Sequence, residues 1–298
     1  MLYFLRVVER LVPPGVVAGR FRVRPPLVKP SKLTLDRSGK NLSQGWAVNF
    51  AVGCTHACKF CYVDSIWKSY GGRFGDIVKT VWGNYLLLPE NLEQAVRLTP
   101  WRRWSGVEVL MSSTHDPYLP QLADGARRIL EAALPDGVSF CIQTRSALAL
   151  RDLPLIAEYG EQVRLQVSVA TMSRDLSRLI EPRVPPVESR LKLLTKARDM
   201  NVRTGVIIAP VLPPVPQRTD WRQDMKEIFA ALSEVRPDFV YGESLHIRGS
   251  NIELLARVLG FRITRESLVR LDREAGELFH ELCRTYGLKS VWWREYDV

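Results

Sequence analysis

Long hydrophobic runs are absent from this sequence of 298 residues. No apolar stretch approaches the ~20 residues that a membrane-spanning helix needs, so we expect no membrane anchor and no membrane partner. The N-terminus is apolar, but Arg6, Glu9 and Arg10 interrupt it, which is not the pattern of a secretory signal peptide. Internal repeats and low-complexity tracts are absent too. These absences predict a globular protein of the cytoplasm.

Cysteine is also scarce, with five residues in the whole chain. That number, without a secretory signal, argues against a disulfide framework and favours a reducing compartment. Three of the five nevertheless lie within eight residues, as Cys54, Cys58 and Cys61. Cys141 and Cys283 stand alone, and Cys283 falls in a late helical segment where we expect a core residue.

The clustered cysteines have C-x₃-C-x₂-C spacing. Three thiolates on one short loop can bind three irons of a cubane [4Fe–4S] cluster, because cysteine is the usual iron–sulfur ligand. No fourth cysteine lies nearby, so one iron is left open, which suits an enzyme and not an electron carrier. The alternative is a zinc site with His56 as the fourth ligand. Tetrahedral zinc sites, however, usually combine two separated pairs of ligands.

At this loop the sequence resembles the radical S-adenosylmethionine (radical SAM) superfamily, whose motif is C-x₃-C-x-aromatic-C, with Phe60 at the aromatic position. The resemblance implies that Cys54, Cys58 and Cys61 bind the cluster and that S-adenosylmethionine is a cosubstrate or cofactor. In that family a flavodoxin or ferredoxin reduces the cluster. Cleavage of S-adenosylmethionine then gives a 5′-deoxyadenosyl radical that abstracts hydrogen from the substrate. The absence of a second cysteine cluster predicts no auxiliary cluster.

Strand-like and helical segments alternate from Trp46 to about residue 247. Strands rich in Val and Ile that alternate with helices indicate parallel βαβ units. Six such strands suit an α/β fold of the partial (β/α)₆ TIM-like barrel type found in radical SAM enzymes better than a complete eightfold barrel. The expected strands are 46–52, 107–111, 138–142, 163–169, 202–209 and 239–241, and the expected helices are 90–98, 121–133, 152–159, 173–180, 187–200 and 221–235.

Three regions are expected along the chain. Residues 1–45 form an N-terminal extension rich in proline and basic residues, residues 46–249 form the radical SAM partial barrel, and residues 250–298 close its open side with helices. Proline at this density argues against helix and against central strand. The extension is either a strap packed on the surface or a basic arm that touches a phosphate backbone. Residues 65–89, rich in glycine and aromatic side chains, are expected to be an irregular insertion.

Further motifs follow the cysteine loop in order. Together they resemble the spore photoproduct lyase-like branch, often labelled DNA repair photolyases, over about residues 45–250. The resemblance implies a radical enzyme of lyase or transferase type acting on nucleic acid. The segments that carry it are Ser113-Thr114-His115-Asp116-Pro117-Tyr118, Gln143-Thr144-Arg145-Ser146, Leu150-Arg151-Asp152, Glu181-Pro182-Arg183 with Arg190, and Gly205-Val206-Ile207-Ile208-Ala209-Pro210.

The resemblance also implies contacts for the methionine part of S-adenosylmethionine. Ser113 and Thr114 offer oxygen acceptors to its ammonium group. Arg145 stands where the family often has a lysine near the carboxylate, and a guanidinium can hold a carboxylate with two hydrogen bonds. Alternatively, Arg145 pairs with Asp116 or Asp152, and Thr114 merely satisfies the backbone.

For the adenosine part, the resemblance implies three more contacts. Ser168 hydrogen-bonds the carboxylate or the ribose, and the backbone around Ile208 and Pro210 lines the adenine beside Phe60. Ser168 is alternatively a residue that satisfies backbone groups. Glu181 is expected to anchor Arg183 or Arg190 in a structural ion pair.

The sequence departs from spore photoproduct lyases at the hydrogen donor. Those enzymes carry a donor cysteine between the cluster loop and the second strand, where this chain has none, and a tyrosine pair of which this chain keeps Tyr62 but has Phe60 instead of the other. Cys141 is a candidate substitute donor, since it shares strand parity with Gln143 and Arg145. The alternative is a buried structural cysteine, because free cysteine is among the most buried residue types.

The net charge of +10 and pI near 9.6 favour a polyanionic partner. Nucleic acid or a nucleotide is the expected substrate, and the eight tryptophans can stack on bases. A protein or small-metabolite substrate is the alternative, and a non-enzymatic RNA-binding protein stabilised by zinc or a cluster is another. Glu243, His246 and Arg248 follow the sixth strand and are candidates to face the substrate.

Overall fold

An open eight-stranded sheet forms the centre of the computed structural model, which describes residues 11–31, 45–69, 74–247, 249–294 and 296. Its neighbours run β2–β3–β5–β6–β7–β8–β9–β10, and every described pair is parallel except β2 with β3. The strands are β2 (Val28–Pro30), β3 (Trp46–Val48), β5 (Glu108–Met111), β6 (Ser139–Thr144), β7 (Val163–Val169), β8 (Arg203–Val211), β9 (Phe239–Ser244) and β10 (Ser290–Trp293).

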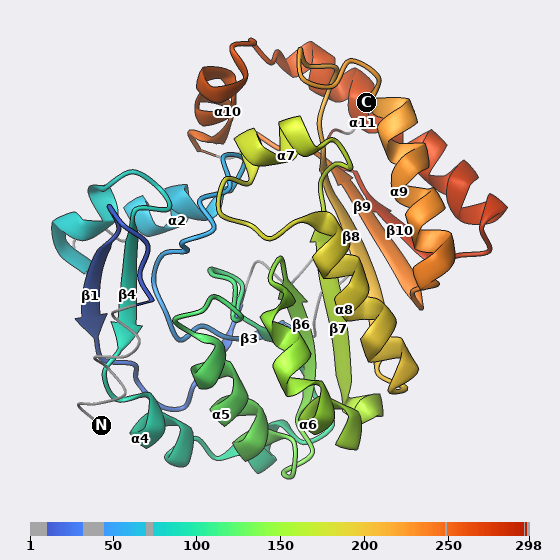
Figure 1. Ribbon diagram of the computed structural model, residues 1–298. Helices are drawn as coiled ribbons and strands as arrows, with labels where there is room; N and C mark the ends of the chain where they lie inside the picture. The colour runs from blue at the N-terminus through green and yellow to red at the C-terminus, as the bar shows by residue number, and fades with distance from the viewer. Residues whose placement is uncertain (1–10, 32–44, 70–73, 248, 295, 297–298) are drawn as a thin grey trace.

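Helices cover the outer face of this sheet (Figure 1). Helices α5 to α9 begin within two residues of the predicted positions. Side chains fix several starts: the Asp220 carboxylate accepts from the backbone N–H groups of Arg222 and Gln223 at the start of α9. Among the described helices, none combines the length and apolarity needed to cross a membrane. The helices are α5 (Ala123–Ala133), α6 (Leu153–Glu158), α7 (Arg174–Ile180), α8 (Val187–Asp199), α9 (Trp221–Val235), α10 (Asn251–Leu259) and α11 (Arg265–Thr285).

The predicted partial barrel is therefore confirmed, with six alternating strand–helix units and β10 added beside β9. Side chains alternate across each strand. On β6, Phe140 and Ile142 pack into the main core with the helices, whereas Cys141 packs inward against Ala47 and Leu110. Gln143, of the same parity on β6, and Arg145, directly after the strand, thus face the inside of the sheet at its carboxyl end.

The segment before α4 (Leu92–Arg97) differs from the prediction of an irregular insertion. It contains α2 (Val63–Ser69), the short 3₁₀ helix η2 (Gly75–Lys79) and β4 (Tyr85–Pro89). Strand β4 pairs in parallel with β1 (Val17–Phe21) of the N-terminal extension, apart from the large sheet (Figure 1). The extension is thus built into two sheets, and Pro30 lies on the edge strand β2, where proline is tolerated.

Candidate active site

The three clustered cysteines lie on one loop after β3, at the carboxyl end of the parallel strands. Cys54 and Cys58 are buried, and Cys61 is half-buried. The loop turns tightly, since Cys61 N–H donates to the Cys58 carbonyl at 3.3 Å and Ala57 adopts a φ of 59°. Loops at this end of a parallel barrel carry its chemistry. The structure places the predicted ligands where the sequence pattern expected them.

The segment before β4 supports this loop from one side. Gly53 has a φ of 91°, and a Cβ there would lie 2.4 Å from the carbonyl oxygen of Tyr85. A Cβ on Gly83 would lie 2.2 Å from the Cβ of Ala57. Backbone can approach backbone this closely only where glycine removes the side chain. The stretch 83–85 therefore shapes the cysteine loop.

The thiols lie close enough to raise one another's pKa. Burial is the largest cause, raising the pKa of Cys54 and of Cys61 to about 12, and the pKa of Cys58 is raised too. Electrostatic repulsion between thiolates adds to this shift for all three. Deprotonation of all three thiols therefore requires a positively charged metal centre that compensates the charge of the thiolates.

Three cysteines on one loop match the ligand type of an iron–sulfur cluster. Within the described ranges, no three His, Cys, Asp or Glu side chains converge as ligands of one metal ion would. A cubane presents its irons at separate corners, so its thiolates need not converge. His56 is not free to bind zinc: its Nε2 contacts Asp116 Oδ2 at 3.0 Å, and its Nδ1 contacts the Arg183 carbonyl at 3.3 Å. The residues present fit a three-cysteine [4Fe–4S] site.

Asp116 joins the cysteine loop to the ends of β5 and β6. Besides His56, it accepts from Thr144 Oγ1 at 2.7 Å, from the Arg145 N–H at 2.7 Å and from the Tyr118 N–H at 2.8 Å. Burial alone would raise the pKa of Asp116, but His56 and these hydrogen bonds outweigh it and lower the pKa below its usual value. Asp116 is thus an ionised hub that sequence reasoning assigned only as a possible partner of Arg145.

Asn49 gathers the residues expected at the methionine ammonium. Its Oδ1 accepts from the Ser113 N–H at 2.8 Å and from Thr114 Oγ1 at 3.1 Å, and its Nδ2 donates to Ser113 Oγ at 3.1 Å. Ser112, with a φ of 68°, shapes the turn that presents them. Sequence reasoning missed Asn49, because the expected strand ran to residue 52 and enclosed it, whereas β3 ends at Val48. A polar residue within an otherwise apolar run was the available signal.

Arg145 lies on the other side of the loop, over the Phe60 ring at 5.1 Å. Its Nε donates to Glu181 at 2.7 Å, its Nη2 donates to the Ala209 carbonyl at 2.9 Å, and Glu181 also accepts from the fully buried Arg190 at 2.9 Å. The expected Glu181–Arg190 ion pair is confirmed. The alternative in which the Arg145 side chain pairs with Asp116 or Asp152 is wrong, because the carboxylate that it contacts is Glu181.

This chain of charges remains ionised in the fold. Burial would raise the pKa of Glu181, but Arg190 and Arg145 outweigh it and lower the pKa. For Arg145, burial acts against the charge, while Glu181 and Cys58 raise the pKa above its ordinary value. The guanidinium beside Cys58 is therefore permanently cationic, as a carboxylate-binding group must be.

The residues expected around adenosine occupy β7 and β8. Ser168 is buried on β7 in register with Ile207, and its carbonyl accepts from Arg190. The Ile208 side chain packs outward into the core, so only its backbone can face a ligand. Pro210 is buried within a break of register between Ile208 and Val211. Such bulges are common next to active sites.

The candidate hydrogen donors lie at different depths. Tyr62, next to Cys61, is 38% exposed at the mouth. Cys141 is fully buried on β6 in register with Leu110 and Arg164, and Arg145 follows the end of that strand. Burial raises its pKa to about 12, so it stays a thiol. This position favours the structural alternative for Cys141.

The other candidates are also placed. Cys283 is buried in α11, as expected for a core residue. At the mouth, His246 Nδ1 lies 3.9 Å from Glu243 Oε2, and Arg248 lies outside the described residues.

Comparison with known proteins gives clear sequence relatives. The model of the Radical SAM superfamily matches residues 48–228. An uncharacterized protein of Acidianus two-tailed virus is 49% identical over 281 residues, covering 93% of each chain. An uncharacterized protein of Mycobacterium tuberculosis is 31% identical over 215 residues, which are 69% of this chain and 60% of that relative.

Solved structures of spore photoproduct lyase share the fold. The enzyme complexed with dinucleoside spore photoproduct matches with a TM-score of 0.66 at 15% identity, over 93% of this chain and 82% of that one. A mutant with bound AdoMet and dinucleoside spore photoproduct gives a TM-score of 0.66 at 14% identity, over 93% and 81%.

Proposed function

Because the chain belongs to the radical SAM superfamily, we propose that Cys54, Cys58 and Cys61 hold a [4Fe–4S] cluster that activates S-adenosylmethionine. The observation that carries this proposal is the loop of three closely placed thiols, without a fourth cysteine or a free histidine, at the carboxyl end of a parallel sheet. When bound, the cluster and S-adenosylmethionine supply a 5′-deoxyadenosyl radical that abstracts hydrogen from a substrate.

The chain's own residues bind and orient the cosubstrate. Ser113 and Thr114, held by Asn49, offer oxygen atoms to the methionine ammonium. Arg145 offers its guanidinium to the carboxylate, while Glu181 and the Ala209 carbonyl fix the orientation of that guanidinium. These side chains would bind the ammonium and the carboxylate of methionine and so orient the cosubstrate.

For the adenosine part, we propose Phe60 and the backbone of Ile208 and Pro210 as the adenine contacts, with Ser168 at the ribose or carboxylate. Phe60 already carries the Arg145 guanidinium over its ring, so one aromatic side chain serves both halves of the site. Tyr62 is the preferred hydrogen donor, because its side chain is partly exposed whereas Cys141 is fully buried.

The proposed substrate is a nucleic acid or a nucleotide. Support comes from the net charge of +10, which attracts polyanions over long range, and from the shared fold with an enzyme that has been solved with a dinucleoside photoproduct. We propose a small electron-transfer protein of flavodoxin or ferredoxin type as the reductant.

Anaerobic reconstitution tests the proposal. The protein should bind about four irons per chain and become brown. Addition of dithionite and S-adenosylmethionine should release 5′-deoxyadenosine. A colourless protein that binds zinc and releases no nucleoside would contradict the proposal. Steeply salt-dependent binding to single-stranded DNA or RNA would support the substrate class.

A further inference from the structure

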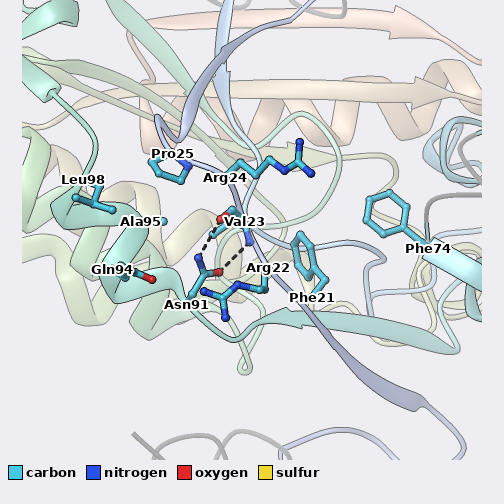
Figure 2. Close-up of a pocket in the computed structure, with 10 residues that line it drawn as sticks. All are labelled: Phe21, Arg22, Val23, Arg24, Pro25, Phe74, Asn91, Gln94, Ala95 and Leu98. Carbon is cyan, nitrogen blue, oxygen red and sulfur yellow. Dashed lines mark hydrogen bonds between the residues drawn. The ribbon is translucent and has the colours of Figure 1, made fainter.

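A second pocket lies away from the cysteine loop, between the N-terminal extension and α4. Its volume is about 650 Å³, within the range of small-ligand sites. Figure 2 shows the extension along one side and α4 along the other, with the Phe74 ring at one end. The lining residues are Phe21, Arg22, Val23, Arg24, Pro25, Phe74, Asn91, Gln94, Ala95 and Leu98.

The walls of this pocket are held in place by hydrogen bonds. Asn91 accepts from the Val23 N–H at 2.9 Å and donates to the Val23 carbonyl at 3.0 Å (Figure 2). The Phe21 carbonyl accepts from the Glu90 N–H at 3.0 Å, and Leu27 N–H donates to Thr99 at 2.9 Å. A ligand would therefore meet a preformed surface and would not have to order it.

The lining combines aromatic rings with two arginine side chains. Phe21 and Phe74 meet edge to face at 6.0 Å. Leu98, which is 55% exposed, lies at the opposite end of the pocket from Phe74 (Figure 2). Arg22 shares its charge with Glu90 at 3.2 Å, whereas Arg24 has no carboxylate partner among the described residues. Between residues 11 and 31 the chain carries four basic side chains and no acidic one. A flat ring joined to an anion, as in a nucleotide, matches this combination.

We infer that this pocket holds a nucleotide of a single strand that flanks the target nucleotide in the barrel mouth, an inference that rests on the proposed nucleic-acid function. The base would lie against the Phe21 and Phe74 rings, with phosphate at Arg22 and Arg24. Phe74 contacts Trp67 of α2 at 5.3 Å, and α2 begins directly after the cysteine loop. One helix thus links the pocket to the active site.

A free mononucleotide offers the same base and phosphate, but the high net charge favours a strand. Each arginine that contacts a single strand releases counterions and makes the dependence of log K on log salt concentration steeper by about 0.7. The pocket would then contribute affinity independent of sequence, since stacking on phenylalanine accepts every base.

The test measures binding of a fluorescent oligothymidylate between about 50 and 200 mM salt. The double variant Arg22→Gln with Arg24→Gln should weaken binding roughly 10-fold and reduce the salt slope by about 1.4. Leu98→Asp, at an exposed position, should weaken binding through its new carboxylate. The matched control is Arg270→Gln with Arg273→Gln on α11, which removes the same charge on a distant part of the molecule (Figure 1).

Each outcome decides the inference. It is overturned if the control pair weakens binding as much as the pocket pair, or if neither pair changes it. Competition by thymidine monophosphate at the concentration of the oligomer would show a mononucleotide site and overturn the strand assignment. A wild-type protein that releases 5′-deoxyadenosine but binds no oligomer would overturn both this inference and the nucleic-acid substrate, while leaving the cluster proposal intact.

Discussion

The five cysteines of this chain are all removed from bulk water to some degree, yet their surroundings separate them into two kinds. Cys54, Cys58 and Cys61 share one loop, whereas Cys141 on β6 and Cys283 in α11 each lie apart from the other cysteines. Burial raises the pKa of all of them. Only Cys54, Cys58 and Cys61 can bind one metal cluster together, which would compensate the charge of their thiolates. We therefore expect only these three cysteines to be required for iron binding.

Cys61→Ser tests this division directly. A serine oxygen is a poor replacement for an iron–sulfur ligand, so the variant should lose most of its iron and release no measurable 5′-deoxyadenosine. Iron content and nucleoside release are measured after anaerobic reconstitution. Cys283→Ala, in the core of α11, is the control and should keep both. Full iron in Cys61→Ser would contradict the ligand assignment.

Arg145 differs from a lysine in how many partners it can hold at once. It already contacts Glu181 and the Ala209 carbonyl, and its planar fork still offers donors to a carboxylate. Arg145→Lys keeps the charge but not this geometry. The KM for S-adenosylmethionine should rise roughly 10-fold with little change in kcat, as the loss of one good charged hydrogen bond predicts.

The measurement is the rate of 5′-deoxyadenosine release against S-adenosylmethionine concentration. Arg164→Lys is the matched control, since Arg164 also lies inside the sheet but pairs with Glu108 at its other end. An unchanged KM in Arg145→Lys, or an equal rise in both variants, would remove Arg145 from the cosubstrate site.

His115 makes stability depend on pH. It is buried against Phe50 at 4.8 Å between ring centres, and burial lowers its pKa from 6.5 to about 3. Below pH 6.5, His115 binds a proton in the unfolded chain but stays neutral in the native protein. The free energy of unfolding therefore falls as the pH falls toward 3. The limiting slope from this group is about 1.4 kcal/mol per pH unit.

His115→Leu should flatten the fall in stability between pH 6.5 and about 4 by removing that slope. Denaturant unfolding at several pH values gives the slope separately from the absolute stability, which the substitution also changes. His280→Gln, at an exposed histidine of α11, should keep the wild-type slope. A steeper fall in His115→Leu would be inconsistent with a neutral buried imidazole.

The contact between the cysteine loop and the stretch before β4 is an arrangement of elements, and glycine makes it possible. Gly83→Ala would bring a methyl group within 2.2 Å of Ala57, displacing the loop and lowering iron binding at least several-fold. Gly106→Ala is a close control: φ is 74° there and 90° at Gly83, but a Cβ on Gly106 meets nothing within 4 Å. Both variants carry the backbone strain of a positive φ, about 1–2 kcal/mol.

Iron content per folded chain, with circular dichroism to confirm folding, separates the two effects. Equal iron binding in Gly83→Ala and Gly106→Ala would show that the stretch before β4 does not shape the cluster loop.

The large sheet could be predicted because local patterns encode it. The stretch Val163–Val169 reads as a buried strand and forms β7 with the same bounds. The cysteine loop was predictable for the same reason, since it follows a strand that the pattern locates. Strand β4 was not predictable, because its partner β1 lies more than sixty residues earlier in the chain and no local sequence pattern indicates that the two strands pair.

Side-chain partners of the site show the same limit. Arg145 and Glu181 were both singled out by motif, yet their ion pair joins residues 36 positions apart. Asn49 was missed because the expected strand ran to residue 52 and enclosed it, whereas β3 ends at Val48. Its role appears only when β3 and β5 are brought side by side.

The molecule as a whole is an open barrel in which the proposed cosubstrate contacts come from well-separated strands. Asn49 and Ser113 follow β3 and β5, whereas Ser168 and Pro210 belong to β7 and β8, with β6 between the two sides. Edge strands β2 and β10 lie at opposite ends of the described sheet and do not pair. A ligand that contacts residues from β3 and β5 and also from β7 and β8 would connect strands that are not direct neighbours across β6.

S-adenosylmethionine should therefore stabilise the entire fold of the cluster-loaded protein. At 100 times its Kd, a ligand that binds only the native state adds about 2.7 kcal/mol, which corresponds to a rise in Tm of roughly 4–5 °C for a chain of this size. Anaerobic thermal unfolding with and without the ligand measures the shift. Cys61→Ser, without the cluster, should shift by less than about 1 °C at the same concentration, because Arg145 and Ser113 then lack the metal that completes the site. An equal shift in both proteins would mean that the protein side chains alone bind the cosubstrate and that the open iron contributes nothing to holding it.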